Sequence, residues 1–377
     1  MSGMIPHHVL HALAMAFAMF WELLWALVLG FALSGVVQAV VSKKEVSKLL
    51  PDDSPRSIAI ACGLGAASSS CSYAAVALAR SLFRKGAGFT AAMAFEVAST
   101  NLVAELGIIL AILIGWQFTL AEFAGGVLLV ALLVLLFRLF LTSGMVDAAR
   151  EQAGKGLKGK MEGHAEMDMA VTEGPLLRRI FSAKGWTAIS HYFVMDWLAV
   201  WKDIAVGLLL AGALGAWVPQ SFWNRFFLTG HPLLAKFWGP LVGPVVAILS
   251  FVCSVGNVPL AAVLWNGGSS FGGVIAFLYA DLIVLPILDI YRKYYGGRMS
   301  LFLLATLYAA MALTAVAIEF LFQALHLIPA QRRALVMEEA IRWNYTTVLN
   351  LAFLAVAGLL IWRFFTTGGP KMMSKME

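Results

Sequence analysis

The amino-acid sequence predicts an all-α polytopic membrane protein built from two homologous halves. Three observations lead to this prediction: an apolar composition, a series of apolar segments and an internal repeat. Of the 377 residues, 61% are hydrophobic and 13% are charged, and the mean hydropathy is +0.84. Such a composition is atypical of water-soluble domains and typical of chains that lie in a bilayer. We therefore expect the lipid bilayer to be the main partner of this chain.

The apolar segments follow one another between charged or turn-rich stretches. Crossing the hydrocarbon takes about 20 apolar residues in a helix, and most of the segments reach that length. The segments are 9–41, 57–80, 89–115, 119–142, 189–218, 238–264, 271–290, 300–326 and 345–365. They divide the chain into a first transmembrane repeat (1–142), a hydrophilic connector (143–188), and a second repeat with an extra C-terminal helix (189–377).

The connector 143–188 is the most basic stretch of the chain, and we place it in the cytoplasm because cytoplasmic loops carry an excess of Lys and Arg. Its Met161–Met169 cluster, with His164 inside it, is open to a soft-metal interpretation, although a solvated linker is favoured. The net charge of +6 does not indicate nucleic-acid binding, because the basic residues lie at the ends of apolar runs.

An internal repeat relates the two halves. A shift of 182 residues lays 71–95 over 253–277 with ten identities in 25 positions, where roughly two or three are expected from so biased a composition. The identities include the pairs Cys71/Cys253 and Ser72/Ser254. The sequence therefore indicates a duplication whose halves are joined by the connector.

Loop charges favour an inverted arrangement of the halves. If the paired segments 57–80 and 238–264 are re-entrant hairpins or broken helices, thirteen Lys and Arg residues of the loops and tail lie on the cytoplasmic side and five outside. If every segment crosses, the distribution becomes six against twelve, which opposes the positive-inside tendency. We therefore predict an inverted repeat, with the N-terminus outside and the C-terminus inside.

The paired segments contain the candidate binding residues. The first is rich in small and hydroxyl side chains, and the second contains Pro259, a helix breaker. Interrupted segments at corresponding positions of two halves indicate the binding site of a transporter. Because thiolates are soft ligands, the two paired cysteines are also tentative metal ligands, whereas Cys62 is matched by Pro244 and is interpreted as packing. The candidate substrate-binding residues are Cys71, Ser72, Tyr73, Cys253, Ser254, Asn257 and Asn101.

Polar residues inside apolar runs are the candidate coupling or gating groups. A carboxyl group at membrane depth is costly and usually faces a bundle interior. Glu96 and Thr100 share a helical face, and Asp281 takes the position of Ser99 in the second half. A purely structural hydrogen-bonding role is the alternative for each of them. The predicted coupling or gating residues are Glu96, Thr100, Glu105 and Asp281.

The sequence contains no phosphate-binding Gly-rich loop ending in Lys-Ser/Thr and no His-Glu-x-x-His motif. We therefore expect no cofactor, no catalytic residues and no ATP-driven pump, and we predict a secondary transporter of a small solute. An intramembrane thiol-dependent oxidoreductase using Cys71 with Cys253, and a non-transporting membrane scaffold, stay open as alternatives. Homo-oligomer formation is also open.

Two stretches resemble a family of predicted permeases that includes the ArsP-type organoarsenical permeases and YraQ-like proteins. They are Cys71-Ser72 with the later Arg84-Lys85-Gly86-Ala87, and Cys253-Ser254-Val255-Gly256-Asn257-Val258-Pro259. The resemblance covers most of the chain and implies efflux of a small inorganic or organo-metalloid solute across the cytoplasmic (inner) membrane. Tyr73 and Val255 stand where the family's motif has a second Cys, so the two paired positions offer two thiols in all.

Overall fold

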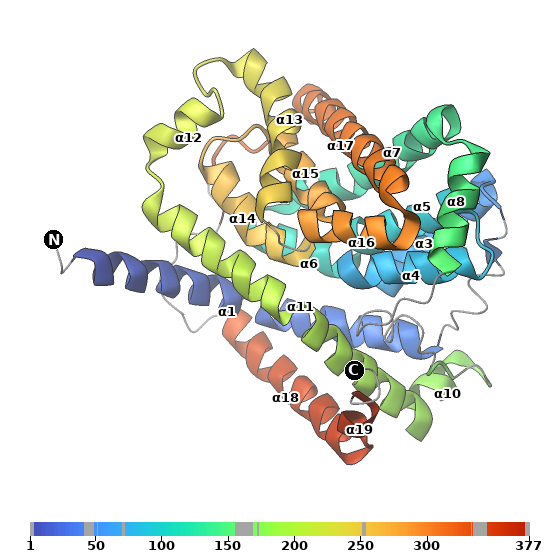
Figure 1. The fold of residues 1–377 in the computed structure, drawn as a ribbon. Coiled ribbons are helices and arrows are strands. Elements are labelled where there is room, and N and C mark those ends of the chain that lie inside the picture. The colour runs from blue at the N-terminus through green and yellow to red at the C-terminus, as the bar shows by residue number, and fades with distance from the viewer. Residues whose placement is uncertain are drawn as a thin grey trace.

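Every regular element in the described part of the chain is a helix (Figure 1). The computed structural model describes residues 4–40, 49–50, 52–69, 72–154, 169–171, 173–250, 254–332, 334 and 345–373. The helical class predicted from the sequence is therefore confirmed for these residues.

The first part of the chain forms one long helix, a series of shorter helices and one further long helix. They are α1 (Met4–Val40), α3 (Pro55–Ser68), α4 (Ser72–Arg84), α5 (Phe89–Asn101), α6 (Ala104–Leu113), α7 (Trp116–Phe140), α8 (Ser143–Gly154) and α10 (Leu176–Phe181). Helix α3 begins at a Ser54 cap followed by Pro55, two residues that favour a helix start. It ends before Ser69, whose left-handed conformation (φ 42°) terminates the helix.

The second part again begins with a long helix, which is followed by shorter helices and further long ones. They are α11 (Ala183–Trp217), α12 (Gln220–Phe226), α13 (Pro232–Ser250), α14 (Ser254–Asn266), α15 (Phe271–Tyr279), the 3₁₀ helix η1 (Ala280–Ile283), α16 (Leu285–Tyr295), α17 (Gly297–Ala324), α18 (Tyr345–Thr366) and α19 (Gly369–Met373). Of the range 143–188, α8, α10 and the first residues of α11 are helical, while 155–168 and 172 lie outside the described residues.

Helix boundaries recur at the spacing of the sequence repeat. Helices α4 and α14 both begin and end 182 residues apart, and α5 and α15 begin at the same spacing. The turns that follow α4 and α14 match too. Gly86 and Gly268 adopt φ values of 105° and 108°, a region that is accessible to glycine and strained for other residues.

Six helices of the described part are long and apolar enough to cross a membrane, and a seventh span results if a bent pair is counted as one. The bent pair is 271–283 with 285–295, at an angle of 41°. The six are Leu23–Val40, Phe89–Leu113, Trp116–Phe140, Pro232–Ser250, Gly297–Ala324 and Thr346–Thr366. The predicted polytopic membrane protein is thus confirmed at the level of composition and helix length.

The helices form two groups. Helices α1, α11 and α18 pack on one another, and Figure 1 shows them below the group that contains α3 to α7 and α13 to α17. In the other group, α3 and α4 pack on α5, while α13 and α14 pack on α15. The groups meet where α11 contacts α14 and where α1 contacts α6. Homologous helices therefore have corresponding neighbours within the second group.

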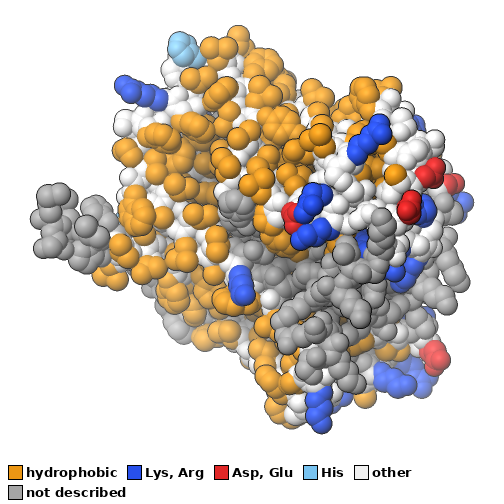
Figure 2. Space-filling view, in the orientation of Figure 1, with side chains coloured by type: hydrophobic (Ala, Val, Ile, Leu, Met, Phe, Trp, Pro, Cys, Tyr) orange, Lys and Arg blue, Asp and Glu red, His pale blue; other side chains and the backbone are white. Residues whose placement is uncertain are grey.

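The face in Figure 2 is mostly apolar, and its charged side chains gather toward the end that carries α8 and α10. Leucines such as Leu241 and Leu249 on α13 and Leu301 on α17 are exposed. An apolar surface of this extent fits a lipid environment.

Candidate functional site

The N-termini of α4 and α14 meet in the interior of the helix bundle. The Ser254 backbone N–H donates to Ser72 Oγ at 3.4 Å, and this hydroxyl donates to Asp281 Oδ2 at 2.6 Å. Ser72 and Asp281 are fully buried. Since helix N-termini carry partial positive charge, a carboxylate beside two of them is electrostatically favoured. This junction joins the two halves of the chain through equivalent serines.

Asp281 is presented by a break in the helix. It lies in η1, between α15 and α16, where the bent pair changes direction. Its second oxygen, Oδ1, has no hydrogen-bond partner among the described residues. A buried carboxyl oxygen normally has a hydrogen-bond partner. Asp281 Oδ1 is therefore an acceptor to which a ligand or a proton can bind.

Two more carboxyl groups lie buried near Asp281 and interact with it electrostatically: Glu96 on α5 and Glu122 on α7. The hydroxyl of Tyr291 donates to Glu96 Oε1. Neither oxygen of Glu122 has a described hydrogen-bond partner, although the Tyr279 hydroxyl donates to the backbone carbonyl of Glu122 at 2.8 Å. The structure therefore brings together three carboxyl groups from three elements.

Amide and hydroxyl groups complete the cluster. The Asn101 side-chain amide donates to Thr100 Oγ1 at 3.0 Å and to the Val97 carbonyl at 3.2 Å, which leaves Asn101 Oδ1 without a described partner. Both polar atoms of the Asn257 side chain, in the first turns of α14, lack described partners although the residue is fully buried. Buried amides of this kind are candidates for binding a solute.

A row of tyrosines leads from the cluster toward α8. Tyr291 and Tyr295 stack at 6.2 Å between ring centroids, and Tyr294 is in edge contact with Tyr295 at the same distance. The Arg80 guanidinium lies 4.4 Å from the centroid of the Tyr294 ring, and its Nη2 donates to the Ala153 carbonyl of α8 at 3.0 Å. Buried polar groups thus extend from Glu96 to the charged end of the molecule.

Other predicted residues lie beside the cluster or outside the described part. Glu105 packs against Gly30 of α1 and interacts with Ser69 at the end of α3, and no described contact joins it to Asp281. Tyr73 is half-buried on α4. Cys71 and Cys253 lie outside the described residues; each immediately precedes one of the two serines that touch.

The sequence interpretation did not single out Glu122, Tyr279 or Tyr291. Glu122 lies in the apolar run 119–142, so the argument used for Glu96, a carboxyl group at membrane depth, applies equally to it. The tyrosines gave no comparable indication, because an aromatic residue in an apolar helix is usually part of the core.

In its described part, the chain has helices of membrane-spanning length that enclose buried carboxyl and amide groups, an arrangement typical of multi-pass membrane proteins of the transporter type. The sequence model of a family described as predicted permease matches residues 8–320. The chain therefore belongs to this predicted permease family.

Two relatives support this assignment. A protein of Mycobacterium tuberculosis (strain ATCC 25618 / H37Rv), named "Putative permease Rv2963", is 64% identical over 338 residues, which is 89% of this chain and 83% of the relative. The "UPF0718 protein YraQ" of Escherichia coli (strain K12) is 25% identical over 115 residues, covering 30% of this chain and 32% of the relative. No solved structure matches the chain.

Proposed function

We propose that the chain is a secondary permease of the cytoplasmic (inner) membrane that exports a thiophilic metal(loid) or an organo-metalloid solute. The observation that carries the proposal is the junction of Ser72, Ser254 and Asp281, where two interrupted segments meet around a buried carboxyl group. Half-helices that meet at an ionisable group are the usual construction of a secondary-transporter site. Membership of the predicted permease family supports transport as the activity.

The same junction supports an inverted repeat. The equivalent helices α4 and α14 start side by side, since Ser254 N–H donates to Ser72 Oγ. Each helix has 13 residues and is therefore about 20 Å long. The C-terminal end of α4 lies against α8, whereas the turn after α14 lies against α12, where Gln220 Nε2 donates to the Gly267 carbonyl. Figure 1 places α8 and α12 at opposite sides, as expected for copies that run in opposite directions.

The thiols provide the chemical selectivity in this proposal. In the sequence, Cys71 and Cys253 each come one residue before a serine of the junction. A soft solute would bind to these thiols. Ser72, Ser254 and Tyr73, with the amides of Asn101 and Asn257, would line its path, consistent with the unpartnered amide atoms.

The carboxyl groups provide the coupling. We assign proton binding to Asp281 and Glu96, with Thr100 and Glu105 as gating groups, because a carboxyl group is expensive to keep charged at membrane depth. Binding of a cationic solute near Asp281 would displace its proton. Tyr291, whose hydroxyl donates to Glu96, offers a hydroxyl group for the return path.

Transport measured with purified chain in proteoliposomes tests the proposal. Trivalent arsenicals, Cu(I), Zn(II) and selenium compounds should be compared for wild type, Cys71→Ser, Cys253→Ser and the matched control Cys62→Ser. We expect the first two variants to lose transport of one soft solute and the control, a half-buried thiol on α3, to keep it. Transport that is unchanged in both Cys71→Ser and Cys253→Ser would remove the thiols from the mechanism.

A further inference from the structure

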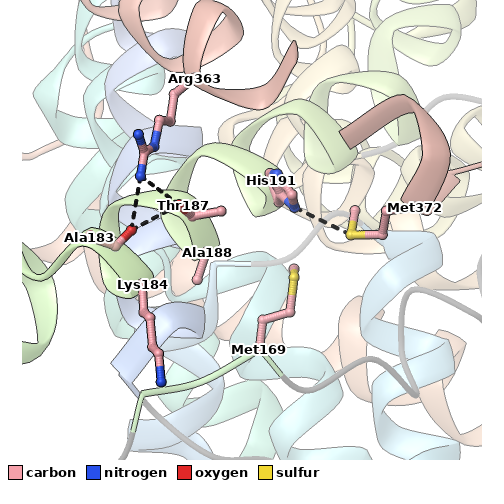
Figure 3. A pocket seen from close by; sticks show the side chains of 8 residues that line it. All are labelled: Met169, Ala183, Lys184, Thr187, Ala188, His191, Arg363 and Met372. Atoms are coloured by element: carbon pink, nitrogen blue, oxygen red, sulfur yellow. Dashed lines mark hydrogen bonds between the residues drawn. The ribbon is translucent and has the colours of Figure 1, made fainter. Parts of the chain in front are cut away.

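A second candidate site lies outside the carboxyl cluster, between the N-terminal half of α11 and the C-terminal helices α18 and α19. It is a pocket of about 500 Å³ (Figure 3). Its lining includes the side chains of His191, Met372 and Met169, which come from three separate stretches of the chain. A ring nitrogen and two thioethers are neutral donors, and no thiol or carboxyl group lies among the described lining residues.

Hydrogen bonds fix the tautomer of His191. Thr367 Oγ1 lies 2.6 Å from the Arg363 carbonyl, to which it donates its single proton. The same oxygen lies 2.9 Å from His191 Nε2, so it must accept a proton from that nitrogen. In the neutral ring the lone pair is then on Nδ1, which faces Met372 Sδ at 3.3 Å.

This places two acceptors face to face. A neutral Nδ1 has no proton to give, and a thioether sulfur has none either. Two donors that share one metal ion, each about 2 Å from it, lie roughly 3–4 Å apart, which matches the observed separation.

The third donor is held at the pocket by its backbone. The Met169 N–H donates to the Tyr192 hydroxyl at 2.9 Å, and the Val171 N–H donates to the Ala39 carbonyl of α1 at 2.8 Å. Figure 3 shows the Met169 side chain rising toward the His191–Met372 pair, with its sulfur at the upper end. The segment 169–171 is thereby fixed between α1 and α11.

The positive charge around the pocket and the chemical softness of its donor atoms favour one kind of metal ion. Lys184 and Arg363 also line the pocket; Arg363 is engaged by Thr187 Oγ1 at 3.0 Å and by the Ala183 carbonyl at 3.3 Å. Two positive charges and a neutral donor set oppose a divalent ion more strongly than a monovalent one. Thioether ligands prefer Cu(I) among biological metals.

We propose that His191 Nδ1, Met372 Sδ and Met169 Sδ form a binding site for Cu(I). The site goes beyond the proposed function, because its donors and its position are independent of Cys71, Cys253 and Asp281. It accounts for the facing acceptors of His191 and Met372 and for the placement of Met169.

Competition for Cu(I) tests the site directly. The full chain, purified in detergent with Cys62, Cys71 and Cys253 all changed to Ser, should be titrated anaerobically with Cu(I) against a bathocuproine chelator. We expect one tight equivalent, with an X-ray absorption spectrum of one nitrogen and two sulfur neighbours. Met372→Leu and Met169→Leu, which preserve apolar volume, should each weaken binding at least about tenfold, an amount equal to about 1.4 kcal/mol.

Two control variants distinguish this pocket from other places in the chain where Cu(I) could bind. Met195→Leu changes a buried methionine of the same helix that does not line the pocket, and it should leave binding unchanged. His164→Ala with Met167→Leu tests the connector cluster and should also leave binding unchanged. Unaltered affinity and spectrum in Met372→Leu would overturn the proposal, as would binding that is lost only in the connector variant or a pocket that takes up inorganic phosphate instead of Cu(I).

Discussion

Arg150 and Arg332, 182 residues apart, hold equivalent turns of the two halves through the same set of contacts. Arg150 donates to the carbonyls of Phe83 and Ala87, and its guanidinium lies 4.1 Å from the Phe83 ring centroid. Arg332 donates to the carbonyls of Trp265 and Ser269 and lies 4.2 Å from the Trp265 ring centroid. Each acceptor is also displaced by 182 residues, so the repeat extends to individual hydrogen bonds.

Arg150→Ala and Arg332→Ala should each destabilise the chain by about 2 kcal/mol, because each change leaves two carbonyl groups without their charged donor and removes a cation–π contact. Thermal unfolding in detergent measures the effect. Arg138→Ala, an exposed arginine in the last turn of α7, is the matched control and should change little. Equal stability of all three variants would show that these arginines do not hold the turns.

Asp281→Asn should reduce transport roughly tenfold or more while leaving the fold intact. The amide oxygen can still accept the proton of Ser72 Oγ, but the side chain can no longer change its charge. Initial rates in proteoliposomes with an imposed proton gradient measure the effect. Ser72→Ala, which removes the donor and keeps the carboxyl group, should retain proton dependence. A fully active Asp281→Asn protein would exclude this residue from coupling.

Glu122→Leu should make the protein more stable while reducing its transport activity. Leu304 occupies the equivalent position of the second half, so leucine is compatible with this place in the architecture. Removing a buried carboxyl group that lacks a described partner should raise the free energy of unfolding by on the order of 1 kcal/mol. Transport should fall if the interaction between Glu122 and Asp281 serves coupling. Loss of stability in Glu122→Leu would instead indicate that the carboxyl group is satisfied in the bilayer.

Asp52→Asn should weaken the cap of α3 at neutral pH and have no effect in acid. Hydrogen bonds from Ser57 and then Ser54 lower the pKa of Asp52 below its ordinary value of 3.8. A lowered pKa contributes stability above the unfolded-state pKa, and this contribution is lost as the pH falls through the folded-state pKa. The melting temperatures of wild type and variant should be measured at neutral pH and at a pH below the pKa of Asp52. The variant should melt at a lower temperature than wild type at neutral pH, and the difference should disappear at the lower pH.

Much of the fold could be predicted from the sequence because hydropathy and the repeat act over long stretches. The helix boundaries at Ser72 and Ser254 follow the predicted repeat register. The site was harder to predict, because it depends on which helices pack against one another. Asp281 contacts Ser72 only because the two halves of the chain pack together. Glu122 could have been identified from its position in an apolar run, whereas the pairing of Glu96 with Tyr291 required the three-dimensional arrangement. The roles of Cys71 and Cys253 stay a prediction.

The positions of the two arginines in the chain also affect the order of assembly during synthesis. Arg150 lies in α8, the helix after α7, so its acceptors Phe83 and Ala87 have left the ribosome before the second half is made. The first half can thus fix its own turn while it waits in the bilayer. The Ser72–Asp281 bond cannot form at that stage, because Asp281 is translated more than 200 residues after Ser72. The nascent first half must therefore keep the Ser72 hydroxyl group and the start of α4 accessible to Asp281 and α14, which are made later, so this junction is a point at which the halves could misassemble.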